Sequence, residues 1–309
     1  MSTETPSPPG MVGEGLRALV ISAQPFLAQA WTTTLQARGH LPVAYLTSPG
    51  PRRRRLEGYK QIVEQFSATA DVIVSSRPSL WRRLFEPYEI DIITCCGFPW
   101  RLPADLLELP RLGAINSHPS LLPMYRGAGP NVFGWMFRND EREAGATVHR
   151  MSAEFDTGAI LAQGRIPIED DDDVAALIQR LGQVFMQVLD AGLAAAEAGE
   201  PGREQEGEGF YAVPFEEEWR RVDWSQPARL VHNQVRSWTG MESQGHAVAV
   251  IDGKEVTVRR TRLLPAAAPN GQAAPGTVLS RDGDQLVIQC GDGPLLVVDW
   301  APVEAPPPG

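Results

Sequence analysis

The sequence predicts an α/β fold, with a Rossmann-like, mostly parallel sheet, helices on both faces of that sheet, and a smaller β-rich C-terminal domain. Three observations predict it. Short apolar runs alternate with helical stretches early in the chain, as strands buried on both faces alternate with crossover helices. A long amphipathic helix then leads into a stretch rich in Gly, Glu and Pro. Beyond that stretch, apolar and polar residues alternate, which is typical of strands with one buried face.

The strands of the parallel sheet are expected first, because each is a short apolar run. They are Leu16–Ile21, Leu41–Leu46, Asp71–Val74, Asp91–Cys96 and Ala114–Asn116. A helix is predicted from Pro25 to Arg38, since proline is tolerated in a first turn and Gly39 ends the helix. Another helix is predicted from Ser79 to Phe85.

Two further strands are predicted at Thr147–Met151 and Ile160–Gln163, followed by a long amphipathic helix from Asp173 to Glu197. A helix from Gln226 to Ser237 comes after the Gly- and Pro-rich stretch. The expected C-terminal strands are Ala247–Ile251, Glu255–Arg259, Gly276–Leu279 and Leu286–Ile288. The first two are joined by Asp252-Gly253, a tight hairpin signal.

These elements predict a division of the chain into five parts. They are a disordered tail (1–15), an N-terminal α/β domain (16–199), a linker (200–218), a β-rich domain (219–303) and a disordered, Pro-rich tail (304–309).

Composition excludes several classes of protein. The net charge of −10 and the pI near 5.1 argue against a general nucleic-acid binder, although a local basic patch remains compatible with them. Three cysteines make neither a disulfide framework nor a spaced metal motif, and Cys95-Cys96 are expected to be buried in a strand. The N-terminus lacks a signal-peptide pattern and no apolar run is long enough to span a membrane, so we expect a cytoplasmic protein without membrane contact.

The candidate catalytic residues follow the strand that ends near Asn116. Asn116 and His118 are two residues apart in an extended segment, so their side chains point to the same side. A His moves protons near neutral pH, an Asn amide donates to a developing oxyanion, and an Asp orients the His. Asp156, in Phe155-Asp156-Thr157-Gly158, is the candidate carboxylate. This set suits acyl transfer to an amine.

The run from Asn116 to Gly127, N-S-H-P-S-L-L-P-M-Y-R-G, together with Asp156-Thr157-Gly158, resembles the signature of the folate-dependent formyltransferases. That family includes glycinamide ribonucleotide, methionyl-tRNA and sugar-amine formyltransferases. The resemblance is specific from about Ile90 to about Ile168. It implies that Asn116, His118 and Asp156 are catalytic and that 10-formyltetrahydrofolate is the co-substrate. It also implies an OB-like C-terminal domain, introduced here by Val222-Asp223-Trp224.

The resemblance further implies a pterin pocket between two segments. Its expected lining is Phe98, Pro99, Trp100, Arg101 and Leu102, together with Ser152, Ala153, Glu154 and Phe155. Trp100 and Phe98 are of a type that stacks on a flat ring, and equally of a type that fills a core. The expected supporting or substrate-binding residues are Ser120, Tyr125, Arg126 and Gly127.

Two charged runs have alternative interpretations. Asp170–Asp173 is expected to be a solvated helix N-terminus rather than a metal site, because consecutive acids point in different directions. Arg52–Arg55 is interpreted as a solvated loop, a tRNA contact or a site for an anionic substrate group. No metal is expected.

The expected reaction is transfer of a formyl group to the primary amine of a small molecule, such as an amino sugar, an amino acid derivative or a natural-product amine. Methionyl-tRNA is the alternative acceptor. Three features disfavour it. Ile21–Pro25 differs from the turn usual in tRNA formyltransferases, and Arg236–Gly240 lacks the Pro-rich turn typical at that place. The second domain is also not basic, which is poor for binding phosphates. A formyl-tetrahydrofolate hydrolase is the third hypothesis, and a catalytically silent folate-binding module the fourth. Because small-molecule members of this family are often dimers, a homodimer is also expected.

Overall fold

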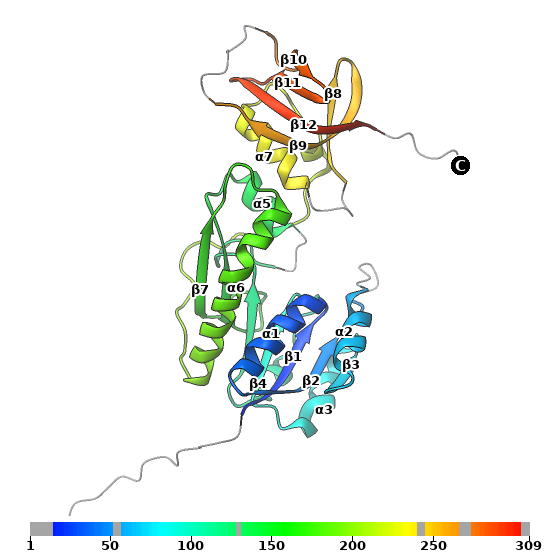
Figure 1. Cartoon of the computed structure of the whole chain (residues 1–309). Coiled ribbons are helices and arrows are strands. Elements are labelled where there is room, and N and C mark those ends of the chain that lie inside the picture. Colours follow the sequence, from blue (N-terminus) through cyan, green and yellow to red (C-terminus); the bar gives the residue numbers. More distant parts are fainter. Residues whose placement is uncertain (1–14, 52–56, 128–130, 240–244, 266–272, 304–309) are drawn as a thin grey trace, which may run out of the picture. The chain divides into compact units, whose positions relative to one another are not determined.

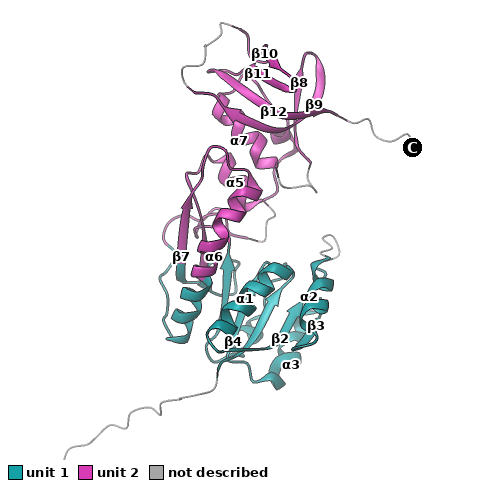
Figure 2. Cartoon of the chain, viewed as in Figure 1, with its two compact units in different colours: residues 1–118, 148–162, 189–205 teal, residues 119–147, 163–188, 206–309 magenta. Residues whose placement is uncertain are grey.

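The computed structural model describes residues 15–51, 57–127, 131–239, 245–265 and 273–303 (Figure 1). The chain divides into two compact units whose segments interleave along the sequence (Figure 2). Unit 1 comprises residues 1–118, 148–162 and 189–205, and unit 2 comprises residues 119–147, 163–188 and 206–309. The predicted domain boundaries stay a prediction.

The α/β fold is confirmed by a seven-stranded sheet in the order β3-β2-β1-β4-β5-β6-β7. Its strands are β1 (Arg17–Ser22), β2 (Leu41–Thr47), β3 (Asp71–Val74), β4 (Ile92–Cys96), β5 (Ala114–His118), β6 (Glu143–Arg150) and β7 (Ile160–Pro167). Strand β1 pairs in parallel with both β2 and β4, so the order of the strands reverses between β1 and β4. Such a reversal leaves a crevice at the carboxyl ends of the strands, where ligands of open α/β sheets bind.

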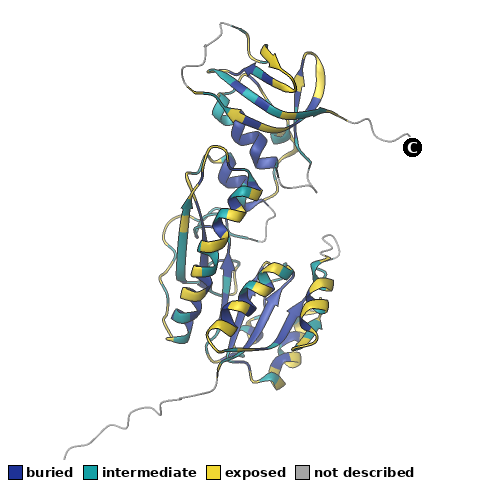
Figure 3. Cartoon of the chain, in the orientation of Figure 1, coloured by how far each residue is buried: buried dark blue, intermediate teal, exposed yellow. Residues whose placement is uncertain are grey.

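Helices cover both faces of the parallel strands in unit 1. They are α1 (Pro25–Ala37), α2 (Gly58–Phe66), η1 (Pro78–Leu80), α3 (Trp81–Phe85), η2 (Glu86–Tyr88) and α4 (Ala104–Leu107). Tyr45 of β2 stacks on Phe66 of α2 and hydrogen-bonds Thr32 of α1. Its neighbours in β2 point the other way. They belong to the core cluster that contains residues of α3 and α4. Strands β1, β2 and β4 are accordingly largely buried, and the outer sides of α1 and α2 are exposed (Figure 3).

Two details of unit 1 differ from the prediction. The helix expected from Ser79 to Phe85 is a short 3-10 turn followed by the five residues of α3. Strand β5 extends two residues beyond Asn116, to His118. Asn116 and His118 are therefore the third and fifth residues of a regular strand, and alternation along that strand places them on one side.

The β-rich C-terminal domain is also confirmed, as part of unit 2. Its five-stranded sheet has the order β10-β11-β12-β9-β8. The strands are β8 (Ala247–Ile251), β9 (Lys254–Leu263), β10 (Val278–Asp282), β11 (Gln285–Gln289) and β12 (Pro294–Pro302). Asp252 and Gly253 both have positive φ, at 50° and 73°, as the predicted tight hairpin requires. Strand β12 was not among the predicted strands.

Three further helices complete the described chain: α5 (Val132–Arg138), α6 (Val174–Glu197) and α7 (Ala228–Trp238), with the short turn η3 (Glu217–Arg220) before α7. Helices α5 and α7 pack closely within unit 2. Gly134 permits this approach, since a Cβ at that position would lie 2.7 Å from the carbonyl oxygen of Ser237. The guanidinium of Arg236 lies 4.3 Å above the ring of Phe137, which adds a cation–π contact to this packing.

The acidic run Asp170–Asp173 lies at the N-terminus of α6 and makes ion pairs and a helix cap, while Asp170 and Asp171 stay exposed to solvent. Asp170 pairs with Arg229 at 2.6 Å, Asp171 with Arg262 at 3.1 Å, and Asp172 with Arg180. The fourth carboxylate, of Asp173, accepts a hydrogen bond from the backbone N–H of Ala176 in the first turn of α6. Among the described residues, no group of three or more His, Cys, Asp or Glu is arranged to hold a metal ion.

No helix in the described part of the chain has both the length and the apolar content that crossing a membrane requires.

Candidate active site

Strand β5 delivers two of the predicted catalytic residues to the carboxyl edge of the sheet. It pairs with β4 in parallel, with Asn116 beside Cys95 and Ser117 beside Cys96. His118 is the last residue of the strand and only 6% exposed, whereas Asn116 is half-buried. Both side chains emerge where the strand ends, the position at which α/β folds place their reactive groups.

Asp156 comes from the loop that connects β6 to β7. Its φ of 55° is left-handed, a conformation that Asp tolerates better than most residues. The loop is closed by Arg150 N–H donating to Ala159 O at 2.8 Å. Gly158 is required there, since a Cβ would lie 1.9 Å from the carbonyl oxygen of Arg150. The turn thus fixes the backbone from which the carboxylate of Asp156 projects.

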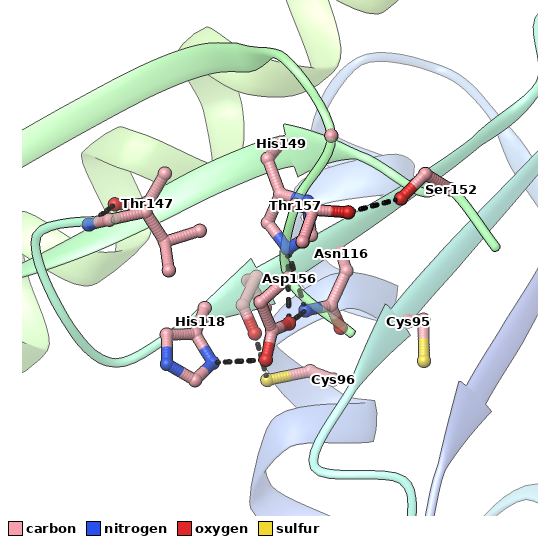
Figure 4. Close-up of polar contacts among 12 residues, drawn as sticks. Cys95, Cys96, Asn116, His118, Thr147, His149, Ser152, Asp156 and Thr157 are labelled. Atoms are coloured by element: carbon pink, nitrogen blue, oxygen red, sulfur yellow. Dashed lines mark hydrogen bonds and ion pairs between the residues drawn. The ribbon is translucent and has the colours of Figure 1, made fainter. Parts of the chain in front are cut away.

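The three predicted catalytic side chains come together (Figure 4). Oδ2 of Asp156 lies 3.5 Å from Nδ1 of His118, and Oδ1 accepts a hydrogen bond from Nδ2 of Asn116 at 3.2 Å. Asp156 is 9% exposed, so this carboxylate is nearly buried. A buried carboxylate at this distance fixes the orientation of the neighbouring imidazole.

His149 is a fourth member of this cluster, and the sequence analysis did not identify it. Its Nε2 lies 3.0 Å from Nδ2 of Asn116 and 3.3 Å from Oδ1 of Asp156, and the ring is 2% exposed. His149 lies in the apolar strand β6, and a single His in a strand of alternating residues does not by itself indicate a function. One signal was available: it lies only seven residues before Asp156.

The contacts of His149 determine its neutral tautomer. Its Nδ1 lies 2.8 Å from the carbonyl oxygen of Arg150, which only accepts, so Nδ1 carries the proton. In the neutral ring, Nε2 then accepts one N–H of Asn116, and the second N–H of that amide donates to Asp156. Both amide hydrogens of Asn116 are engaged in this state. A proton on Nε2 would instead make His149 a donor to Asp156 and release one of them.

The two cysteines beside the cluster are buried, as predicted. The thiol of Cys96 donates to the carbonyl oxygen of Ser117 at 3.1 Å. Burial is the main cause that raises the pKa of Cys96 to about 12 and the pKa of Cys95 well above its usual value. The Asp156 carboxylate acts in the same direction. Neither thiol is a nucleophile at neutral pH.

The two segments of the expected pterin pocket are held together by Arg101. Its Nε donates to the carbonyl oxygen of Ala153 at 3.0 Å, and its Nη2 pairs with Glu154 at 2.9 Å. The guanidinium also lies 5.9 Å from the ring centroid of Phe155. Segments 97–102 and 152–155 are therefore neighbours, as a shared pocket needs.

The aromatic residues of the first segment divide into two kinds. Phe98 and Leu102 are 7% and 5% exposed and belong to the core under α3. Pro99 and Trp100 are half-buried. The indole N–H of Trp100 donates to Ser48 Oγ at 2.9 Å, which fixes its ring at the carboxyl edge of β2. Trp100 is thus better placed than Phe98 to meet a flat ligand.

The four expected supporting residues lie in unit 2. Ser120 Oγ donates to the carbonyl oxygen of Met124 at 2.6 Å, and the buried Tyr125 donates its hydroxyl hydrogen to Glu141 at 2.6 Å. Arg126 pairs through its backbone with residues 210 and 212. Gly127 has a φ of 96°. These contacts shape the loop after His118. Arg52–Arg55 lie outside the described residues.

The sequence and the fold both resemble known proteins. Residues 17–191 match the family model described as formyl transferase, and residues 215–304 match the one described as formyl transferase, C-terminal domain. A methionyl-tRNA formyltransferase from Pelobacter propionicus is 32% identical over 290 residues, which cover 91% of this chain and 87% of the relative.

Two solved structures have a similar fold. An N-formyltransferase from Helicobacter canadensis, in complex with folinic acid and dTDP-3-aminofucose, has a TM-score of 0.66 at 15% identity. The match covers 93% of this chain and all of the other. HypX from Aquifex aeolicus, in complex with tetrahydrofolic acid, has a TM-score of 0.61 at 21% identity. That match covers 94% of this chain but only 45% of HypX. At these identities the likeness shows the fold alone.

Proposed function

Because this chain belongs to the formyl transferase family, we propose that it transfers the formyl group of 10-formyltetrahydrofolate to the amino group of methionyl-tRNA. The predicted resemblance to folate-dependent formyltransferases is confirmed, and with it the class of enzyme and the folate co-substrate. The acceptor, the catalytic roles and the pocket residues are proposals.

One observation supports methionyl-tRNA as the acceptor. The 32% identity to a methionyl-tRNA formyltransferase extends over 91% of this chain and so includes both the N-terminal and the C-terminal family models. The small-molecule acceptor expected from the sequence has weaker support, because the sugar-related structure is only 15% identical. The comparisons therefore support the tRNA alternative better than the expectation.

In the proposed reaction, the acceptor nitrogen attacks the formyl carbon. A new C–N bond forms, the bond from that carbon to the folate nitrogen breaks, the amine loses a proton and the folate nitrogen gains one. Protonated His118 and an N–H of Asn116 stabilise the oxyanion of the tetrahedral intermediate. Asp156 orients His118 and serves as a relay for the proton, consistent with the 3.5 Å between Oδ2 and Nδ1.

The oxyanion role of Asn116 requires one rearrangement. Both of its amide hydrogens are engaged, by His149 and Asp156. Catalytic hydrogen bonds commonly form their final geometry only in the complex with substrate. We propose that the formyl oxygen takes over one of these two hydrogens when the donor binds.

A small-molecule amine is the second candidate acceptor, and the charges of the C-terminal domain favour it. Residues 215–304 contain nine Lys and Arg but twelve Asp and Glu. Several of these arginines are paired within the chain: Arg221 with Glu255, Arg229 with Asp170, Arg259 with Asp299, Arg262 with Asp171, and Arg281 with Asp252. A surface of this kind attracts phosphates less than a basic one.

The acceptor is tested by following the conversion of 10-formyltetrahydrofolate to tetrahydrofolate in parallel reactions. The arms are charged initiator tRNA, a panel of amino sugars and amino acid amines, and no acceptor. Turnover with the tRNA supports the proposal, and it should weaken steeply with added salt, because released counterions drive such binding. Turnover with a small amine and not with the tRNA would identify that amine as the acceptor. Acceptor-free turnover would identify a formyl-tetrahydrofolate hydrolase. The expected homodimer and cytoplasmic location are retained as proposals.

A further inference from the structure

The segment from Glu200 to Gln205, predicted to be the start of a linker, is hydrogen-bonded to the loop that carries Asp156. Arg203 and Ile160 exchange two backbone hydrogen bonds, N–H to O at 2.8 Å and 2.7 Å. The guanidinium of Arg150 donates to the carbonyl oxygens of Leu112 and Glu200, both at 2.7 Å. All of these residues belong to unit 1. The segment is therefore held at Glu200 and again at Arg203.

Gln205 ends this segment with two contacts to the Asp156 turn. Its amide Nε2 donates to the carbonyl oxygen of Asp156 and to the carbonyl oxygen of Gly158, each at 2.8 Å. A single nitrogen thus holds two carbonyls two residues apart. The torsions between those carbonyls, φ and ψ of Thr157 and of Gly158, cannot change singly without breaking one of the bonds, and the carbonyl group of Asp156 is itself held in direction.

This restraint matters because the backbone of Asp156 is unusual. A non-glycine residue at φ of 55° is higher in energy than one in the right-handed or extended regions, and such a conformation persists when its surroundings fix it. Part of that support lies inside the loop, where Ser152 Oγ bonds Thr157 Oγ1 at 2.8 Å. Gln205 supplies support from outside it.

We propose that Gln205 is a positioning residue for the carboxylate of Asp156, holding the left-handed turn so that the carboxylate stays aligned with His118 and Asn116. The inference rests on the proposed catalytic role of Asp156. Gln205 touches no reacting group. It acts on the backbone, and its loss misaligns the carboxylate.

The test uses three variants of the full chain. Gln205→Met keeps the length of the side chain and removes both donors. Gln205→Glu keeps the shape; when ionised it offers only acceptors to the two carbonyls, and when protonated it donates again. Glu204→Gln, at the exposed neighbouring position, is the matched control. Steady-state kcat and KM for 10-formyltetrahydrofolate are measured with the acceptor that the wild type uses.

For Gln205→Met we expect kcat to fall about 10- to 100-fold, because small misplacements of a catalytic group have effects of this size. KM for the folate should stay within about threefold of the wild type, since ground-state binding is retained. Gln205→Glu should lose a similar factor at about pH 8 and recover part of it relative to the wild type as the pH falls towards about 4.3, where half of a Glu is protonated and its one O–H can bond one of the two carbonyls. The deficit of Gln205→Met should not depend on pH in this way.

Two results would overturn the inference: a kcat of Gln205→Met within about twofold of the wild type, or a ratio of Gln205→Glu to wild type that stays flat with pH. If Gln205→Met does not fold, the pH dependence of the ratio of Gln205→Glu to wild type decides alone, because the same folded variant is measured at each pH. Asp156→Ala is run in parallel. Retained turnover in Asp156→Ala would remove the proposed role of Asp156, whereas loss there with full activity in Gln205→Met would remove only the role of Gln205.

Discussion

Nε2 of His149 lies 3.0 Å from Nδ2 of Asn116, and this contact makes the imidazole the acceptor for one hydrogen of the amide. The opposite ring nitrogen is anchored on the carbonyl oxygen of Arg150 at 2.8 Å. His149 therefore sets the rotation of the Asn116 amide, much as groups behind a metal ligand orient that ligand.

The first prediction concerns His149. His149→Leu removes the acceptor that sets the rotation of the Asn116 amide, so we expect kcat to fall about 10- to 100-fold. His149→Gln is the matched variant, because its amide both accepts from Asn116 and donates to Arg150. It should keep most of the activity. Equal losses in the two variants, measured in the same folate-conversion assay, would contradict the orienting role.

The second prediction concerns the two groups proposed to move protons. His118→Ala and Asp156→Ala should each lower kcat by about 10²- to 10⁴-fold, the range typical of a lost general acid or base. Binding of the folate, measured by quenching of tryptophan fluorescence, should largely remain. Substantial turnover in either variant would count against its assigned role.

A third prediction concerns Trp100. Ser48→Ala removes the partner of its indole N–H, so the ring loses its fixed orientation at the proposed pterin pocket. We expect KM for 10-formyltetrahydrofolate to rise several-fold, with kcat little changed. Ser237→Ala is the control, because Ser237 accepts a hydrogen bond from the indole N–H of Trp219, and neither residue is among the expected pocket residues. A KM effect in the control of the same size would show that the pocket is not involved.

The fourth prediction is a dependence of stability on pH that arises from His232. Burial lowers the pKa of this imidazole to about 4, and its Nε2 donates to the carbonyl oxygen of Asp170 at 2.8 Å. As the pH falls below about 6.5, the unfolded chain takes up a proton that the folded chain does not. The free energy of unfolding should therefore drop by about 3 kcal/mol between pH 7 and pH 4 through this one group.

Urea titrations of the wild type and His232→Gln at several pH values check this dependence. The Gln amide replaces both hydrogen bonds of the ring without titrating, so the variant should lose less stability in acid. Asp170 contributes in the same direction in both proteins, because its pKa is lowered mainly by the hydrogen bond from Arg229. Parallel curves for the two proteins would show that His232 is not the group responsible.

The fifth prediction concerns the thiols. Cys96 and Cys290 are buried, and burial raises the pKa of each to about 12. Cys95 is buried as well, and burial raises its pKa well above the usual value. The folded chain should therefore react slowly with a thiol reagent at pH 8, and all three cysteines should react once it is unfolded in denaturant. Fast labelling of the native protein would place a thiol in a more open site.

The elements with strong local signals could be predicted, and those defined by distant partners could not. The strand at Ala247–Ile251 and its Asp252-Gly253 turn follow from alternation and turn chemistry, and the structure has them at those residues. Strand β12 was missed because its residues lie near a Pro-rich end that resembles a tail. A pairing with β9 and β11 creates it, and no local pattern encodes that pairing.

The site shows the same limit. Asn116, His118 and Asp156 were identified because a specific motif surrounds them. His149 and Gln205 were not, since their roles depend on contacts across 33 and 49 positions of the chain. Gln205 lies among Gly, Glu and Pro, a composition that indicates a loop but not what that loop contacts. The ion pairs of Asp170–Asp173 could not be predicted either, because their arginine partners come from α6, α7 and β9.

The interleaving of the two units has a consequence for synthesis of the protein. Residues 119–147 leave the ribosome well before residues 206–309, although both belong to unit 2. Until α7 and the segment before it emerge, Phe137 lacks the guanidinium of Arg236, and Trp135 lacks the ring of Phe215, 5.1 Å away in the finished fold. A nascent chain therefore presents an uncovered aromatic face on α5, which chaperones and proteases recognise. Messages truncated before the codon of Phe215 would yield chains that keep this face uncovered and are degraded.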